Sequence, residues 1–277
     1  MVVESLIKPF KAERKPWEMF FIGMFYSSIA ILLSLWIFRP HASLVMVFLT
    51  VTASVPIMYG TIKLEEKKDL EISSERALIK EHGRALSFFI FLFLGITISF
   101  TLWYVFLPAN VTNTLFSIQT KTITDINTQI TGHSVNQFAL FSKIFFNNIK
   151  VLILCLVFAF VYGFGAIFIL AWNASVIGAA IGNFIRSNVS GVAHFTVYFK
   201  IASLGILRYM VHGIPEILAY FIGGLAAGIV SIAIIKHDFR SKKFQNVLLD
   251  STDLLLLSIV ILLVAALLES FVTPVLF

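Results

Sequence analysis

Charged residues are scarce in this chain. Only 13% of its 277 residues are Asp, Glu, Lys or Arg, whereas 58% are hydrophobic. A water-soluble domain carries about 25% charged residues, so this chain has too few to cover a water-exposed surface. Phe alone accounts for 29 residues, more than a water-soluble fold could hide. The composition therefore excludes a soluble catalytic domain and predicts an integral membrane protein.

Several chemical signatures are also missing. The one cysteine, Cys155, cannot form an internal disulfide, and its apolar surroundings in the sequence predict a small buried side chain. The sequence contains no HExxH string and no nucleotide-binding loop, which argues against a zinc metalloprotease and an ATP-driven pump. The first 16 residues lack the small-residue cleavage site of a signal peptide, so we expect the first apolar run to stay in the membrane.

What the chain does have is a series of long apolar runs. A membrane-spanning helix needs about 20 mostly apolar residues, and backbone groups in lipid have to be bonded within their own segment. The runs therefore predict an all-α, polytopic fold with about seven transmembrane helices. The fifth run is shorter than the others and is interrupted by Gly178 and Gly182. The seven runs are residues 17–38, 42–62, 86–107, 148–170, 172–189, 213–235 and 253–273.

The positions of Lys and Arg predict the orientation of these helices. The net charge of +6 comes from basic residues between the apolar runs, a distribution typical of cytoplasmic loops rather than of nucleic-acid binding. Four basic residues precede the first run, six lie in residues 63–85 and four in residues 236–252, whereas residues 108–147 contain only Lys121 and Lys143. A seven-helix path in a cell membrane then puts the N-terminus in the cytoplasm and the C-terminus outside.

Three segments between the runs need separate interpretation. Residues 195–211 are apolar enough to span, but an eighth span would put the basic residues 236–252 outside, so we expect an interfacial or re-entrant helix there, with the eighth span as the alternative. The outer loop 108–147 has isoleucines at helical spacing, which predicts an amphipathic surface helix. Residues 63–85 are charged on most faces and predict a solvated cytoplasmic helix pair or hairpin, or alternatively a docking site for a cytoplasmic partner.

Ionisable groups inside a membrane are costly and are the first place to look for function. Glu216 lies near the start of the sixth predicted helix and Glu269 near the end of the seventh, so both should lie about one turn from the outer surface. Asn147 and Asn148 open the fourth helix at the same depth, and His212 precedes Glu216 by one helical turn. The five residues predict a polar cluster on the outer side.

This polar cluster is open to several interpretations. It can be polar glue that joins helices, the lining of a pathway for ions or small solutes, or the site of an intramembrane hydrolase. A metal held by His212 and Glu216 would have only two ligands, with His194 as a distant third, so we predict no metal and no cofactor.

Small residues recur along the later helices. They form small-xxx-small patterns that permit close helix approach, as internal packing or as contacts of a homo-oligomer. Asn173 falls at the predicted inner turn between the fourth and fifth helices, where we expect it to cap a helix. The glycines expected at helix contacts are Gly163, Gly178, Gly182, Gly224 and Gly228.

Three motifs together resemble the stage II sporulation protein M family over residues 86–277. They are Phe145-Phe-Asn-Asn148 with the later Trp172-Asn-Ala-Ser-Val-Ile-Gly178, then His212-Gly-Ile-Pro-Glu216, and finally Ala265-Ala-Leu-Leu-Glu269-Ser-Phe-Val-Thr-Pro274. They occur in the family's order. The sequence departs from the family in residues 1–85, which add a basic segment, a transmembrane hairpin and the charged loop, and in Val211, where the family usually has proline.

The resemblance implies a non-enzymatic scaffold or assembly factor rather than an enzyme. In spore-forming bacteria the family member resembles a scaffold for a cell-wall-remodelling complex, whereas this chain resembles the archaeal-type members, to which a sporulation role does not transfer. The partners so implied are the lipid bilayer and other membrane proteins, with no nucleic acid.

Overall fold

The structure, a computed structural model, describes residues 15–72, 75–131, 137–162, 165–189, 195–236 and 241–276. Regular secondary structure in these ranges is helical throughout, which confirms the predicted all-α fold. The elements in chain order are α2 (Glu18–Ile37), η2 (Arg39–His41), α3 (Ala42–Glu71), α4 (Glu75–Phe106), α5 (Ala109–Leu115), α6 (Ser117–Thr131), α7 (Gln137–Tyr162), α8 (Ala166–Val189), α9 (Phe195–Lys236), α10 (Lys242–Leu267), η3 (Leu268–Val272) and α11 (Thr273–Leu276).

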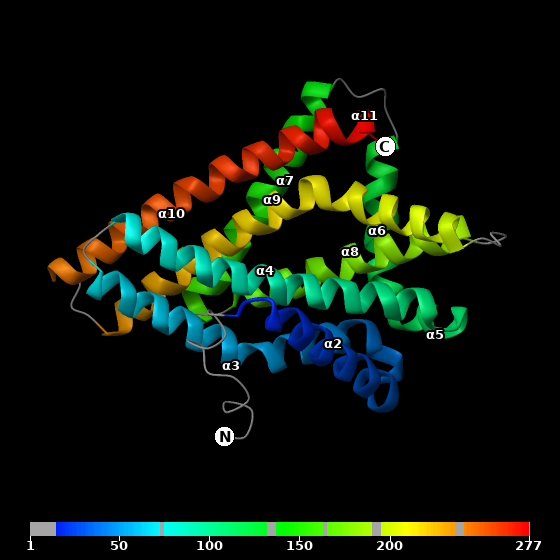
Figure 1. The fold of residues 1–277 in the computed structure, drawn as a ribbon, viewed down its shortest axis with the longest axis horizontal. Coiled ribbons are helices and arrows are strands. Elements are labelled where there is room, and N and C mark those ends of the chain that lie inside the picture. Colours follow the sequence, from blue (N-terminus) through cyan, green and yellow to red (C-terminus); the bar gives the residue numbers. More distant parts are fainter. Residues whose placement is uncertain are drawn as a thin grey trace.

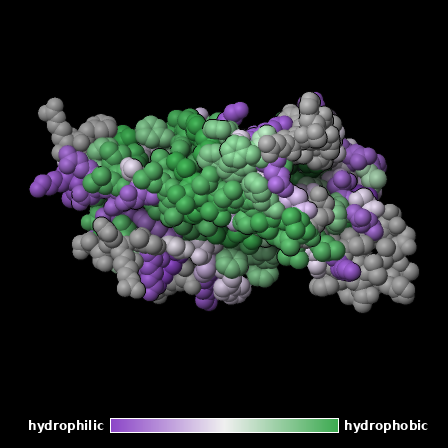
Figure 2. All heavy atoms as spheres, turned by 90° about the horizontal axis from the view of Figure 1, so that it is seen from above, coloured by the Kyte–Doolittle hydropathy of each residue, from purple (hydrophilic) through white to green (hydrophobic). Residues whose placement is uncertain are grey.

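Seven of the described helices are long and apolar enough to cross a membrane, the number predicted from the sequence. They run mostly along the long axis of the molecule (Figure 1). Figure 2 shows hydrophobic side chains in a broad belt across the middle of one face, with hydrophilic side chains gathered mostly toward its two ends. This distribution is the one expected of a helical bundle whose middle faces lipid.

Helix α2 has the length expected of one membrane span. Its 20 residues span about 30 Å, the thickness of the hydrocarbon core. Trp17 and Trp36 lie at its two ends and are 53% and 81% exposed, as is typical of aromatic residues at the two membrane interfaces. Helix α3 folds back along α2 from Ala42 but has 30 residues, so its last turns extend beyond the membrane.

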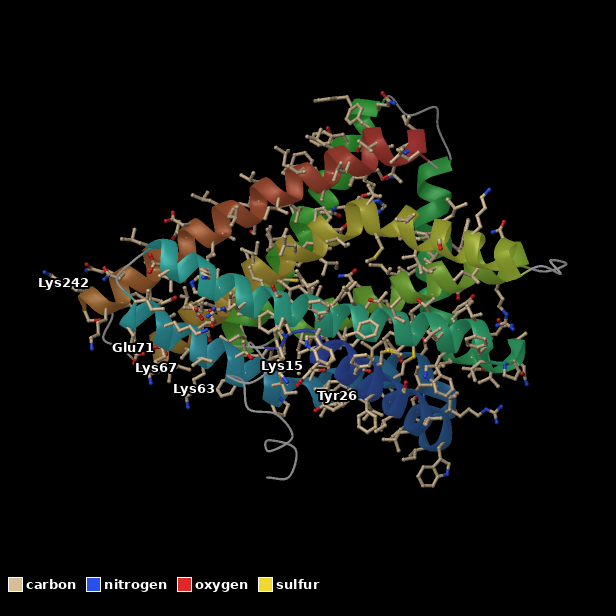
Figure 3. All side chains as sticks on the ribbon, viewed as in Figure 1. Lys15, Tyr26, Lys63, Lys67, Glu71 and Lys242 are labelled. Carbon is tan, nitrogen blue, oxygen red and sulfur yellow. The ribbon has the colours of Figure 1, made fainter. Side chains whose placement is uncertain are left out.

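One end of the molecule is therefore formed by helix extensions outside the membrane. Lys63, Lys67 and Glu71 of α3 lie at this end together with Lys242 of α10 (Figure 3). We call it the charged end. Residues 75–85, which precede the apolar run of α4, extend to the same end as the partner of the α3 extension.

The core is built around α4, which packs against α2 on one side and α8 on the other. Phe88, Phe89 and Phe100 of α4 are fully or almost fully buried. Phe89 stacks on Phe221 of α9 with ring centroids 5.4 Å apart, so α4 also contacts the C-terminal part of the bundle. The hairpin of α2 and α3 is thus packed onto the remaining helices through α4 and α8.

The boundary between the fourth and fifth helices differs from the prediction. Helix α7 ends at Tyr162 and α8 begins at Ala166, whereas the sequence pattern placed the break at residue 171. Hydropathy stays high through the true break, so it does not mark the turn. A Cβ atom on Gly165 would lie 2.2 Å from the Phe158 carbonyl oxygen, which shows how closely the chain folds back. Gly163 lies outside the described residues.

Asn173 is consequently misplaced by the sequence pattern. It lies within α8 and not at an inner turn, so the prediction that it caps a helix is wrong. Its side-chain nitrogen is buried and has no hydrogen-bond partner among the described residues.

Residues 195–211 are not a separate helix. They form the first part of the 42-residue helix α9, whose candidate membrane span is Tyr209–Ile235. The pattern His212-Gly-Ile-Pro215 suggested a new helix start, yet proline is tolerated within membrane helices. At about 63 Å, α9 is twice as long as the hydrocarbon core is thick, and its ribbon bends along its length (Figure 1).

Candidate functional site

The outer polar cluster is assembled from α9, η3 and α11. The Tyr220 hydroxyl, on the buried face of α9, donates a hydrogen bond to Glu216 Oε1 at 2.9 Å, one turn away on the same helix. Glu269 approaches from the other side, close enough for its charge to act on Glu216 and Tyr220. The structure therefore brings together the two acids that were predicted to lie at one depth.

Glu269 lies in an unusual turn. Residues Leu268–Val272 form the π-helical turn η3 between α10 and α11. Single π turns within α-helices are rare and frequently occur at functional sites, because the extra residue redirects a side chain. Just beyond it, the Thr273 hydroxyl lies 3.2 Å from His212 Nδ1, which ties the end of the chain to α9.

The two asparagines of the cluster separate. Asn148 is buried in α7, which packs against α9 and η3, and its side-chain nitrogen has no partner among the described residues. Asn147 is exposed on the other side of that helix.

Of the predicted glycines, Gly178, Gly182 and Gly224 lie against Phe100, Tyr104 and Ala166, respectively, and Gly228 is buried in α9.

Among the cavities between the described helices are two that are not lined by Glu216 or Glu269. The larger, of about 380 Å³, is a groove between α7, α9 and α10 with mostly apolar walls. The smaller has about 20 Å³, room for about one water, and lies between α4, α8 and α9. No group of three or more His, Cys, Asp or Glu side chains in the described ranges is arranged to hold a metal ion, and His194 lies outside those ranges.

A buried polar network in the middle of the chain was not anticipated. Gln119 of α6 is fully buried, accepts a hydrogen bond from the Ser43 hydroxyl at 2.7 Å and donates to the Ser175 hydroxyl at 3.2 Å. It thereby joins α3, α6 and α8. The loop 108–147 forms α5 and α6 as expected of a helical segment, but the buried side of these helices carries Gln119 as well as Leu115 and Phe116.

The charged end holds the second cluster that the sequence analysis missed. Residues 63–85 form a helical hairpin, as predicted, but the hairpin is not solvated on all faces. Glu65, Glu66 and Asp69 of α3 are buried, as is His82 of α4. The three acids occupy the same face of α3 as the buried Met58, Thr61 and Ile62. The buried face of α3 therefore continues beyond its apolar run, with acids in place of apolar residues.

His82 lies between two of these acids. Its Nδ1 atom is 2.7 Å from Glu65 Oε2, and its Nε2 atom is 3.1 Å from Asp69 Oδ1. Lys68 Nζ lies 2.6 Å from the other Glu65 oxygen and 3.3 Å from Glu81 Oε2. An imidazole with a carboxylate at each nitrogen is most stable as the doubly protonated cation. The cluster is thus a buried ionic clamp between α3 and α4.

The protonation of His82 should make this clamp sensitive to alkaline pH. Burial lowers the pKa of His82, but the Asp69 and Glu65 carboxylates outweigh it and raise the pKa from 6.5 to about 9. Since the folded-state pKa is raised, the stabilisation is complete below about pH 6.5 and is lost as the pH rises through about 9. We expect the melting temperature in lipid nanodiscs to fall over this window. The variant His82→Gln should show a smaller dependence, and equal slopes for both proteins would contradict the assignment.

Comparison with known proteins gives one match. The family model described as Stage II sporulation protein M matches residues 86–274, which span α4 to the end of the chain and include the whole outer polar cluster. The helices α2 and α3 lie outside the matched range. No curated protein and no solved structure matches the chain.

Proposed function

We propose that this chain, which belongs to the stage II sporulation protein M family, is a non-enzymatic membrane scaffold that holds partner proteins of an envelope complex together. In this proposal the charged end and the N-terminus face the cytoplasm, as the distribution of Lys and Arg predicts. The other membrane proteins it organises would bind along the bundle or at the charged end.

The observation that carries the proposal is that the acid and the histidine of α9 in the outer polar cluster bond to protein groups. Glu216 accepts a hydrogen bond from Tyr220 within α9, and the contact of His212 with Thr273 joins α9 to α11. The two cavities described above are not lined by Glu216 or Glu269. Acids that line a transport pathway would instead face a cavity open to one side of the membrane. These contacts support the interpretation that the cluster holds the helices of a structural bundle together.

An ion or small-solute transporter is the second candidate, and one observation favours it. Glu216 and Glu269 come from different helices and lie within electrostatic reach of each other, and Glu269 sits in a π-helical turn. Two carboxylates at one depth of a membrane are the arrangement found along many proton and cation pathways.

Substitution of the two acids separates these candidates. We expect wild-type protein in proteoliposomes to give no proton or cation flux above that of protein-free vesicles, and Glu216→Gln and Glu269→Gln to fold normally. Glu216→Ala removes the acceptor of a buried hydroxyl and should lower the free energy of unfolding by about 1–3 kcal/mol. Glu216→Gln keeps an oxygen for Tyr220 and is the matched control.

Flux and stability together decide the outcome. Flux in the wild type that either Gln variant abolishes, with unfolding unchanged, would reject the scaffold and establish the transporter. Absent flux combined with a lower stability of Glu216→Ala supports the scaffold. Tyr220→Phe, which removes the donor instead of the acceptor, should also lower the stability, because it leaves the Glu216 carboxyl group without its hydrogen bond.

A further inference from the structure

The groove between α7, α9 and α10 has the dimensions of a binding site. Its volume of about 380 Å³ falls within the roughly 300–1,000 Å³ of small-molecule sites. Ala227 and Val230 of α9 form its floor, Leu156 and Phe160 of α7 form one wall, and Ser251 and Leu255 of α10 form the other. Phe160 is also exposed at the surface of the bundle, so the groove opens toward the surrounding lipid.

The length of the groove fits one leaflet of the bilayer. Its lining residues cover positions 156–161, 226–230 and 248–255, so the longest wall runs for roughly 10 Å. The hydrocarbon core is about 30 Å thick, or about 15 Å per leaflet. A membrane-spanning helix of a partner would touch the groove over only a third of its length, whereas the chain of one lipid would fill it.

Ser251 gives the groove a polar contact that no protein group uses. The residue is 5% exposed and lines the groove, and its hydroxyl has no hydrogen-bond partner among the described residues. The hydroxyl of the neighbouring Thr252, by contrast, donates to the Leu248 carbonyl of its own helix at 2.8 Å. An unpaired buried hydroxyl is costly, so Ser251 has a donor ready for an oxygen atom of a bound molecule.

We propose that this groove binds one chain of a membrane lipid from the leaflet at the charged end, with the Ser251 hydroxyl donating to the ester or ether oxygen that joins the chain to its headgroup. Ser251 lies nearer than Leu255 to Lys242 at the charged end, so the lipid's polar part points toward the membrane surface and its chain toward the bilayer centre. The site goes beyond the proposed scaffold and does not depend on it.

Photolabelling tests the proposal directly. The full-length protein is reconstituted in dioleoylphosphatidylcholine vesicles that contain a phosphatidylcholine with a diazirine in its acyl chain, then irradiated, digested and mapped by mass spectrometry. We expect groove residues to carry several times more label than Phe21 and Phe25, which face lipid on α2 and are each 59% exposed. Equal labelling of the two regions would overturn the proposal.

Two pairs of variants locate the bound chain. Ala227→Trp fills the groove and should remove most of the groove label, whereas Leu256→Trp, on a lipid-exposed position of α10 outside the groove, should not. Ser251→Ala should reduce the label roughly two- to tenfold, the effect of one neutral hydrogen bond, and Ser258→Ala, which removes a hydroxyl of α10 outside the groove, should leave it unchanged.

The Ser251 pair keeps the test decisive if the tryptophan variant fails to fold, since Ser251→Ala alters only one atom. Unchanged label in Ser251→Ala would reject the hydrogen bond to a lipid oxygen. Absence of label from the groove residues would reject the lipid. If the groove residues were instead cross-linked to another polypeptide, the groove would be assigned to a partner helix.

Discussion

Replacing His82 with Ala is expected to lower the free energy of unfolding by about 3–5 kcal/mol, the usual cost of removing one partner from a buried ion pair. The substitution leaves Glu65 and Asp69 buried without the cation that lies between them. The loss should be visible as a lower denaturant midpoint in nanodiscs or mixed micelles.

A matched control comes from an ion pair on the surface of the same hairpin. Arg84 pairs with Glu81 one turn away, but its side chain is half exposed to solvent. Arg84→Ala should therefore change the stability by no more than about 1 kcal/mol. The triple variant Glu65→Gln, Asp69→Asn, His82→Ala should regain much of what His82→Ala loses, because the two carboxylates that faced the imidazole are replaced by neutral amides. A loss of similar size for Arg84→Ala and His82→Ala would contradict the clamp.

The clamp also shows where sequence patterns stop being informative. Glu65, Glu66 and Asp69 continue the inward stripe of α3 at the same helical spacing as Met58 and Ile62. The spacing of these acids is visible in the sequence. A charged stretch is normally solvated, however, so its regular spacing alone does not predict that the face is buried. Only the placement of His82, 17 residues from Glu65, reveals that the face is buried.

Hydropathy predicted the number of spans because the cost of unsatisfied backbone groups in lipid acts on every run in the same way. It failed at the α7–α8 turn, where Gly165 permits a sharp reversal without any polar residue to mark it. It also missed the continuity of α9, because a 42-residue apolar helix with glycine and proline inside it resembles two segments. The proximity of Glu216 and Glu269 could be predicted from helix direction alone, whereas the bond from Tyr220 could not.

Helix contacts made through glycine are the other feature that patterns capture only in part. Gly178 and Gly182 stood out because they are four residues apart on one helix, and both lie against α4. Gly23 and Gly95 lie on different helices, so no local pattern links them. They nevertheless mark a close approach of α2 and α4, because a Cβ atom at either position would meet the backbone of the other helix.

Gly95→Ala is therefore expected to be among the most damaging single substitutions in the bundle. A Cβ atom at this position would lie 2.0 Å from the Phe20 carbonyl oxygen, and a carbonyl of a neighbouring helix cannot turn aside as a side chain can. The two helices would have to separate along their main contact. We expect a loss of about 3 kcal/mol, the upper end of the typical cost of overpacking, measured by equilibrium unfolding in mixed micelles.

The same helix provides the control for this substitution. Gly83 of α4 has no atom within 4 Å of the position that a Cβ would take, so Gly83→Ala should stabilise the protein by up to about 1 kcal/mol through helix propensity. Gly23→Ala should resemble Gly95→Ala, since its Cβ would meet the Leu92 carbonyl oxygen. The two substitutions strain one interface, so the double variant should lose less than the sum of the single losses. Equal changes in the free energy of unfolding for Gly83→Ala and Gly95→Ala would mean that backbone contact does not hold α2 against α4. The hairpin of α2 and α3 would then be packed against the bundle through side chains alone.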